Sequence, residues 1–205
     1  MRRNTCEPQT PNPKPQTPNP KPTHIQSNIM KQIFTICVLL VSATLNAQNK
    51  VNPVIKNFGT VSEIPYAVEK PDPKLDYKIV VEINSDNPKP ETVHEFFEKT
   101  AAVVNLHALG GVPKEKLHVV MVVHGPAAQF IVNNEAYRKK FGVDNPNLPL
   151  FTALQQAGVQ LFICGQSVVK RNIDPATIAP EVKVSLSAIT ALTTYQLKGY
   201  ALLKY

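Results

Sequence analysis

The sequence lacks the short motifs that mark most nucleotide-binding proteins and many hydrolases. It contains no G-x-G-x-x-G or G-x-x-x-x-G-K-[ST] loop for phosphate groups and no G-x-S-x-G turn that would expose a serine nucleophile. Its five histidines include no His-x-x-x-His pair. These absences argue against nucleotide-dependent enzymes, serine hydrolases and zinc enzymes, and we expect neither a metal nor a cofactor.

The sequence is also short of long apolar runs. The most continuous one, residues 33–45, is shorter than the roughly 20 residues that a membrane-spanning helix needs. Lys31 precedes this run and the small residue Ala47 follows it, which is the pattern of a secretory signal peptide. We therefore predict a signal peptide over residues 30–47, cleavage near Ala47, export to the periplasm and no stable membrane insertion.

Two other interpretations of this segment are weaker. A lipoprotein would carry its cysteine after the apolar run, whereas Cys37 lies inside it. A buried amino-terminal helix would need apolar residues upstream to pack against, and the upstream sequence offers few.

A proline-rich repeat occupies residues 1–29. The seven residues QTPNPKP occur at positions 9–15 and again at 16–22. Proline fixes φ and removes amide donors, and this segment has little apolar surface to bury, so we expect it to be disordered. It is either a tail or sequence upstream of the true start, which leaves Met1 and Met30 as alternative start codons.

Cysteine is scarce, with three residues in 205. Cleavage near Ala47 would remove Cys6 and Cys37 and leave Cys164, so the exported protein would contain no internal disulfide bond. Cleavage would also remove five of the 22 basic residues and one of the 15 acidic residues, which lowers the formal charge from +7 to +3. The basic character therefore argues little for nucleic acid as a partner.

Residues 48–76 contain scattered prolines and predict an irregular arm, and regular structure begins at Tyr77. From there strands and helices alternate, which indicates a single α/β domain over residues 77–205 with a mainly parallel five-stranded sheet and helices on both faces. The expected strands are residues 77–83, 117–123, 159–164, 182–186 and 201–205, and the expected helices are residues 91–109, 127–134, 148–157, 167–171 and 187–198.

Cys164 ends a short apolar strand and precedes Gly165, so it should lie at the carboxyl edge of the sheet, where α/β proteins bind ligands. An ordinary cysteine is only about 3% thiolate at pH 7. Nearby helix amides add only about 0.3–1 kcal/mol of anion stabilisation, so Lys170, Arg171 or His124 would have to contribute if the thiol is reactive. The alternative is that Cys164 is a small apolar residue that packs in the core.

His124 follows a second apolar strand and is the histidine best placed for a role at the same edge. Three roles remain open for it: a base, a hydrogen-bond donor to a bound anion, or a turn residue that satisfies nearby carbonyl groups.

Several short segments in order resemble the DsrE/DsrF-like family. They are VVHGPA at residues 122–127, FICGQS at 162–167, RNI at 171–173 and QLKGY at 196–200, within a resemblance that spans residues 120–205 and is weaker over 77–119. The resemblance implies a compact α/β fold, assembly into trimers or hexamers, and, as in sulfur-relay members, a persulfide on Cys164 with protein sulfur donors and acceptors.

Two functional hypotheses follow. In the first, the protein is at most a sulfur-transfer protein that carries sulfur on Cys164, with His124 and Arg171 as tuning residues. In the second, it is a non-catalytic oligomeric binding protein on the same scaffold, in which Cys164 is inert. Export weighs against the first, because a persulfide outside the cytoplasm meets oxidising conditions and needs its own donor.

Overall fold

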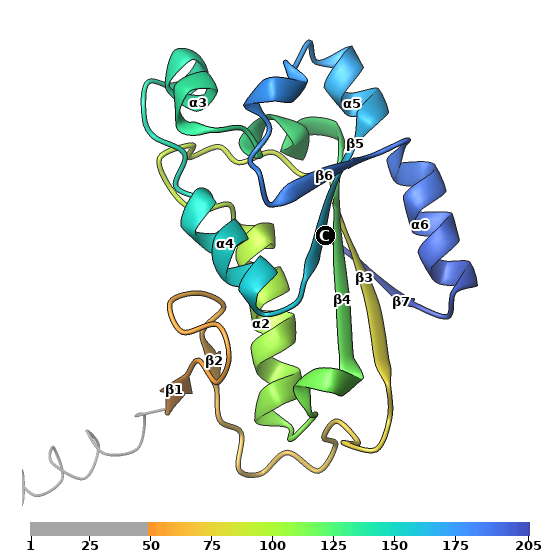
Figure 1. Cartoon of the computed structure of the whole chain (residues 1–205). Helices are drawn as coiled ribbons and strands as arrows, with labels where there is room; N and C mark the ends of the chain where they lie inside the picture. Colours follow the sequence, from red (N-terminus) through yellow and green to blue (C-terminus); the bar gives the residue numbers. More distant parts are fainter. Residues whose placement is uncertain (1–48) are drawn as a thin grey trace, which may run out of the picture. The chain divides into compact units, whose positions relative to one another are not determined.

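The computed structural model describes residues 49–205 (Figure 1). The proline-rich repeat predicted for residues 1–29 and the signal peptide predicted for residues 30–47 lie outside this part of the chain. Among the described helices, none combines the length and the apolar character needed to cross a bilayer.

A five-stranded sheet forms the centre of the domain, in the order β6-β5-β4-β3-β7. Every neighbouring pair is parallel, as predicted. The central strands are almost continuously apolar because helices cover both of their faces. The strands are β3 (Tyr77–Ile83), β4 (Leu117–Val123), β5 (Gln160–Cys164), β6 (Val182–Ser185) and β7 (Ala201–Lys204).

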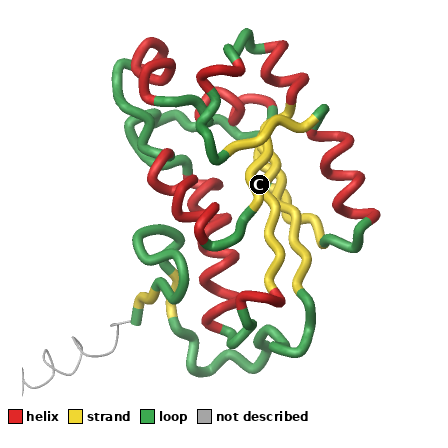
Figure 2. Tube along the Cα trace, viewed as in Figure 1, coloured by secondary structure: helices red, strands yellow, loops and turns green. Residues whose placement is uncertain are grey.

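Helices lie on the two faces of this sheet (Figure 1). Figure 2 shows the same view with helices, strands and loops in different colours. Helices α2 and α4 cover one face and α6 lies on the other. This arrangement confirms the predicted α/β fold. The helices are α2 (Glu95–Leu109), α3 (Asn134–Phe141), α4 (Leu148–Gln156), α5 (Gly165–Lys170) and α6 (Ala188–Leu197), with 3-10 turns η1 (Lys114–Lys116), η2 (Gly125–Phe130) and η3 (Pro175–Thr177).

Two of the expected helices differ from the prediction. Helix α2 begins at Glu95 rather than at residue 91, because His94 is its N-cap. The helix expected over residues 127–134 is instead the 3-10 turn η2, and a separate helix, α3, follows it. Asn133 starts α3 by accepting a hydrogen bond from the Ala136 amide at 3.0 Å, which is a normal capping interaction.

The sheet divides the apolar interior into two unequal cores. Side chains alternate along each strand, so Val81, Met121 and Ile163 face the large core under α2 and α4. Val80, Val120, Val122 and Cys164 face a small core that α6 covers. Ala188 is the single buried residue within α6, so this helix buries little apolar surface against the second face of the sheet.

The segment 49–76 lies on the domain, in contact with α2. It contains two short antiparallel strands, β1 (Lys50–Val51) and β2 (Val61–Ser62), and the rest is turns and irregular chain. Asn105 on α2 is fully buried and hydrogen-bonds the backbone of residues 54–59.

Candidate functional site

The carboxyl edge of the sheet brings Cys164 and His124 together. Cys164 is the last residue of β5, and His124 directly follows β4. Val123 pairs with Ile163 in the parallel register, so the next residues, His124 and Cys164, lie opposite one another on neighbouring chains. The two residues singled out in the sequence therefore lie at neighbouring strand ends, at the carboxyl edge of the sheet.

The Cys164 thiol is free but nearly enclosed. The residue is 5% exposed and packs in the small core beside Ala188 of α6. Gly165 makes the tight turn into α5 possible, since a Cβ atom there would lie 2.7 Å from the Ser185 carbonyl oxygen on β6. The carboxyl end of β5 therefore packs closely against β6 at this turn.

The surroundings of Cys164 favour the thiolate. Burial raises the pKa of the Cys164 thiol, but the Ser167 hydroxyl and the backbone N–H groups of Ala188, Ser167 and Gln166 together outweigh burial, so the pKa lies below its usual value. Within the described chain the sulfur makes no capping hydrogen bond of regular geometry to α5. These groups therefore act as dipoles directed at the sulfur. Their interaction with the sulfur becomes stronger when the thiol loses its proton and carries a negative charge.

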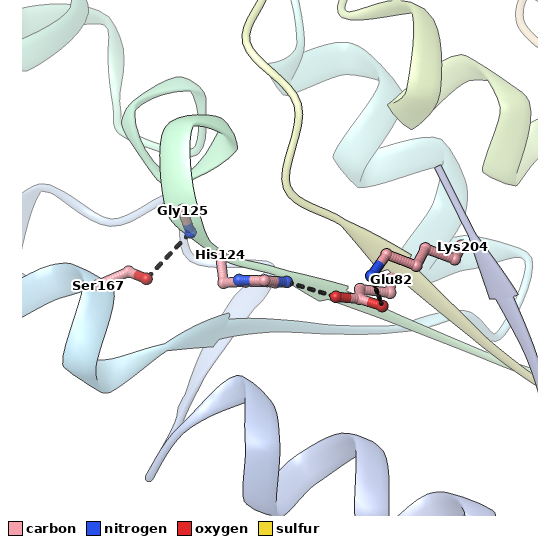
Figure 3. A network of polar contacts seen from close by, with 5 residues as sticks. All are labelled: Glu82, His124, Gly125, Ser167 and Lys204. Atoms are coloured by element: carbon pink, nitrogen blue, oxygen red, sulfur yellow. Dashed lines mark hydrogen bonds and ion pairs between the residues drawn. The ribbon is translucent and has the colours of Figure 1, made fainter.

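Ser167 connects the thiol to the neighbouring strand end. Its Oγ accepts a hydrogen bond from the Gly125 amide at 3.1 Å (Figure 3). Gly125 has a left-handed backbone, with φ of 54°, that favours glycine at this turn. Because Oγ accepts from Gly125, the hydroxyl hydrogen is available to the Cys164 sulfur. This role of Ser167 was not predicted from the sequence, although its position three residues after a strand-end cysteine is a usable signal.

A carboxylate holds His124 from the other side. Glu82 on β3 is 7% exposed, and its Oε1 lies 2.9 Å from His124 Nε2. Its Oε2 lies 3.7 Å from the Lys204 Nζ on β7. Figure 3 shows the His124 ring extending toward Glu82, with Ser167 and Gly125 on the opposite side. Glu82 and Lys204 were not predicted from the sequence, although a glutamate inside the apolar strand YKIVVEI is itself unusual.

Arg171 lies farther from the thiol. It is the C-cap residue of α5, whereas Cys164 is the N-cap residue, so the helix separates them. Lys170 occupies the last turn of the same helix, and both side chains are exposed. The structure does not bring either cation into the cluster of Cys164, His124 and Ser167, and tuning by Arg171 stays a prediction.

A metal centre has no obvious ligand set here. Within residues 49–205, no group of three or more His, Cys, Asp or Glu side chains is arranged to hold an ion.

Comparison with known proteins places most of the chain in one family. The model of the DsrE/DsrF-like family matches residues 79–205. Among solved structures, a protein of unknown function from Methanobacterium thermoautotrophicum, MTH1491, is 18% identical, with 63% of this chain and 100% of that chain covered and a TM-score of 0.48. The ychN protein of E. coli is 16% identical, with 63% and 99% covered and a TM-score of 0.47. No curated protein matches the sequence.

Proposed function

The chain belongs to the DsrE/DsrF-like family, and from this membership we propose that it is a sulfur carrier that holds sulfane sulfur as a persulfide on Cys164. The observation that supports the proposal is the polar shell around the thiol. A buried cysteine with a purely structural role would have its pKa raised by burial, whereas that of Cys164 is lowered. A lowered pKa supplies the thiolate that sulfur transfer requires.

The transfer itself is a thiolate substitution at sulfur. The Cys164 thiolate attacks the terminal sulfur of a donor persulfide, R–S–SH, forming a new S–S bond while the donor's own S–S bond breaks. The products are Cys164–S–SH and the donor thiolate R–S⁻, so the reaction needs no external oxidant or reductant. Delivery to an acceptor thiolate is the same step in reverse.

The non-catalytic binding protein remains the second candidate, because the thiol is only 5% exposed. A donor can reach the sulfur only if the loops at the carboxyl edge of the sheet open. Labelling of the native protein by a thiol reagent separates the two functions. A carrier is labelled in its folded state, whereas an inert core cysteine is labelled only after denaturation.

We also propose export to the periplasm, with cleavage near Ala47, and a homo-oligomeric state such as a trimer or hexamer. Export implies that the sulfur donor and acceptor proteins lie outside the cytoplasm. The oligomer is supported by the exposed apolar residues on and beside α6, among them Leu186 and Ile189, each 75% exposed.

The direct test is the intact mass of the protein purified from its native compartment, before and after treatment with a reductant. We expect a form that is heavier by one or more sulfur atoms, that is lost on reduction and that is absent from Cys164→Ser. The same spectrum reports whether the chain begins at Gln48.

A matched control removes the one side-chain hydroxyl of the polar shell but keeps the cysteine. Ser167→Ala should load sulfur more slowly at neutral pH and equally well at alkaline pH, where the thiol ionises without help. A single unmodified mass that neither sulfide nor polysulfide shifts would refute the carrier and leave the binding protein.

A further inference from the structure

Glu82 is a buried carboxylate that the fold alone does not require. It lies on the inner strand β3, between the apolar residues Val81 and Ile83, and its side chain is 10% exposed. Removing a carboxylate from water costs several kcal/mol unless charged or hydrogen-bonding partners compensate for it. The partners here are His124 and, at the longer distance of 3.7 Å, the Lys204 ammonium, whose side chain is 66% exposed.

The contact with Glu82 fixes the proton on the imidazole ring. A carboxylate accepts hydrogen bonds, so the 2.9 Å contact from His124 Nε2 to Glu82 Oε1 requires a proton on Nε2. In the neutral ring Nδ1 is then the acceptor. When Nδ1 takes up a proton, the carboxylate is already in contact to balance the new charge.

His124 is the titratable side chain next to Cys164 in the register of the sheet. Cys164 ends β5 and faces the small core under α6, whereas His124 follows the neighbouring strand β4 and is partly open to solvent, with a side chain that is 22% exposed. The ring extends toward Glu82 on β3, so that Nε2 faces the carboxylate and Nδ1 lies on the other side of the ring (Figure 3).

From this geometry we infer that Glu82 is a positioning residue that holds His124 as the proton carrier for sulfur transfer at Cys164. The inference rests on the proposed function and names two roles within it. His124 Nδ1 accepts the Cys164 thiol proton, directly or through one water, and the imidazolium pairs with Glu82. After the donor's S–S bond breaks, the same proton passes from Nδ1 to the leaving thiolate, so R–S–SH and Cys164–SH become R–SH and Cys164–S–SH.

The test is the pH profile of Cys164 alkylation by iodoacetamide in the full exported chain, which contains no other cysteine if it begins at Gln48. Glu82→Gln keeps the size of the side chain but removes the negative charge that balances the imidazolium, so Nδ1 becomes a weaker acceptor for the thiol proton. We expect the midpoint of the profile to rise by about one pH unit and the rate at pH 7 to fall by about tenfold.

Lys204→Gln is the matched control, because it removes the other partner of the same carboxylate. Lys204 contacts Oε2 and does not contact His124, so its replacement should leave the midpoint in place. His124→Asn should shift the midpoint as far as Glu82→Gln does, and the double variant should shift it no further, since the two residues act as one unit. A wild-type profile in Glu82→Gln, or additive shifts in the double variant, would overturn the inference.

A second measurement works on the unmutated protein, in case Glu82→Gln does not fold. The ¹⁵N chemical shifts of His124 should show a protonated Nε2 and a bare Nδ1 in the neutral ring. The reverse tautomer would also overturn the inference. Neither measurement involves sulfane sulfur, so a protein with the predicted tautomer and pH profile but no persulfide would refute the carrier function and leave the Glu82–His124 pair established.

Discussion

His94 is the most enclosed histidine of the described chain, at 1% exposure, and its hydrogen bonds require the neutral ring. Nδ1 accepts the Phe96 amide at 3.2 Å, which caps α2, and Nε2 lies 3.1 Å from the Ser85 carbonyl oxygen. The ring stacks on Phe97 at a centroid distance of 4.3 Å. Burial lowers the pKa of His94, and the weaker influences of the Ser85 carbonyl and of Asp86 and Glu95 oppose it.

This lowered pKa predicts a stability that falls in acid. The unfolded chain begins to bind a proton at His94 as the pH drops below about 6.5, while the folded chain resists protonation down to its lower pKa. The contribution of the neutral ring to stability is therefore complete above pH 6.5 and is lost as the pH falls through that window. Urea unfolding between pH 5 and 8 measures the effect.

His94→Asn is the control, because asparagine is a good N-cap residue and does not titrate. At pH 7.5 the variant should be less stable than the wild type by about 2 kcal/mol, through lost ring packing. The difference between the two proteins should shrink as the pH falls to 5. A difference that stays constant with pH would show that His94 does not titrate on unfolding.

At the scale of elements, Asn105 attaches the amino-terminal arm to helix α2. Its Oδ1 accepts the amides of Val54 and Ile55 at 3.0 and 2.9 Å. Its Nδ2 donates to the carbonyl oxygens of Ile55, Phe58 and Gly59 at 3.2, 3.0 and 3.0 Å. One side chain thus provides hydrogen-bond partners for the backbone groups of a loop that has little regular structure.

Asn105→Ala should therefore cost about 2–4 kcal/mol of unfolding free energy, since it leaves buried backbone groups without partners. The amides of residues 54–59 should also exchange hydrogen faster than those of the sheet. Asn57→Ala is the matched control, because Asn57 lies in the same loop with an exposed side chain. Equal effects of the two substitutions would mean that Asn105 does not hold the arm.

The elements also show what the sequence could predict. The bounds of β3 and β4 agree with the prediction because both strands are mainly apolar segments bounded by polar turns. Helix α3 was missed because its sequence, NEAYRKKF, buries only Tyr137 and has no apolar stripe. Cys164 and His124 were identified as strand-end residues, but Glu82 reaches His124 through the pairing of β3 with β4, which the sequence does not specify.

At the scale of the whole molecule, several large apolar side chains are exposed around the start of α6. Leu186 and Ile189 flank the start of α6, and Val184 on the edge strand β6 is 53% exposed. Val169 on α5 is 74% exposed and lines one shallow hollow together with Val184, Leu186 and Gly165. Large contiguous apolar patches on soluble proteins usually mark interfaces, and this one borders the turn that contains Cys164.

We therefore predict that the protein is an oligomer and that the double substitution Leu186→Lys, Ile189→Lys dissociates it. Charges placed in an apolar interface lose their hydration without gaining partners, so association should weaken by about a hundredfold or more. Sedimentation equilibrium would measure the mass of each form. Val68→Lys is the control, since Val68 is fully exposed on the arm, away from α6 in sequence, and its replacement should leave the mass unchanged.

The same variant tests whether assembly protects the thiol. If a neighbouring subunit covers the turn at Gly165, the dissociated protein should react with iodoacetamide faster at Cys164 than the oligomer does, at equal thermal stability. An unchanged rate in a dissociated protein would show that the single chain already sets access to the sulfur, through Gly165 and the small core under α6. A wild-type protein that sediments as a monomer would refute the interface itself.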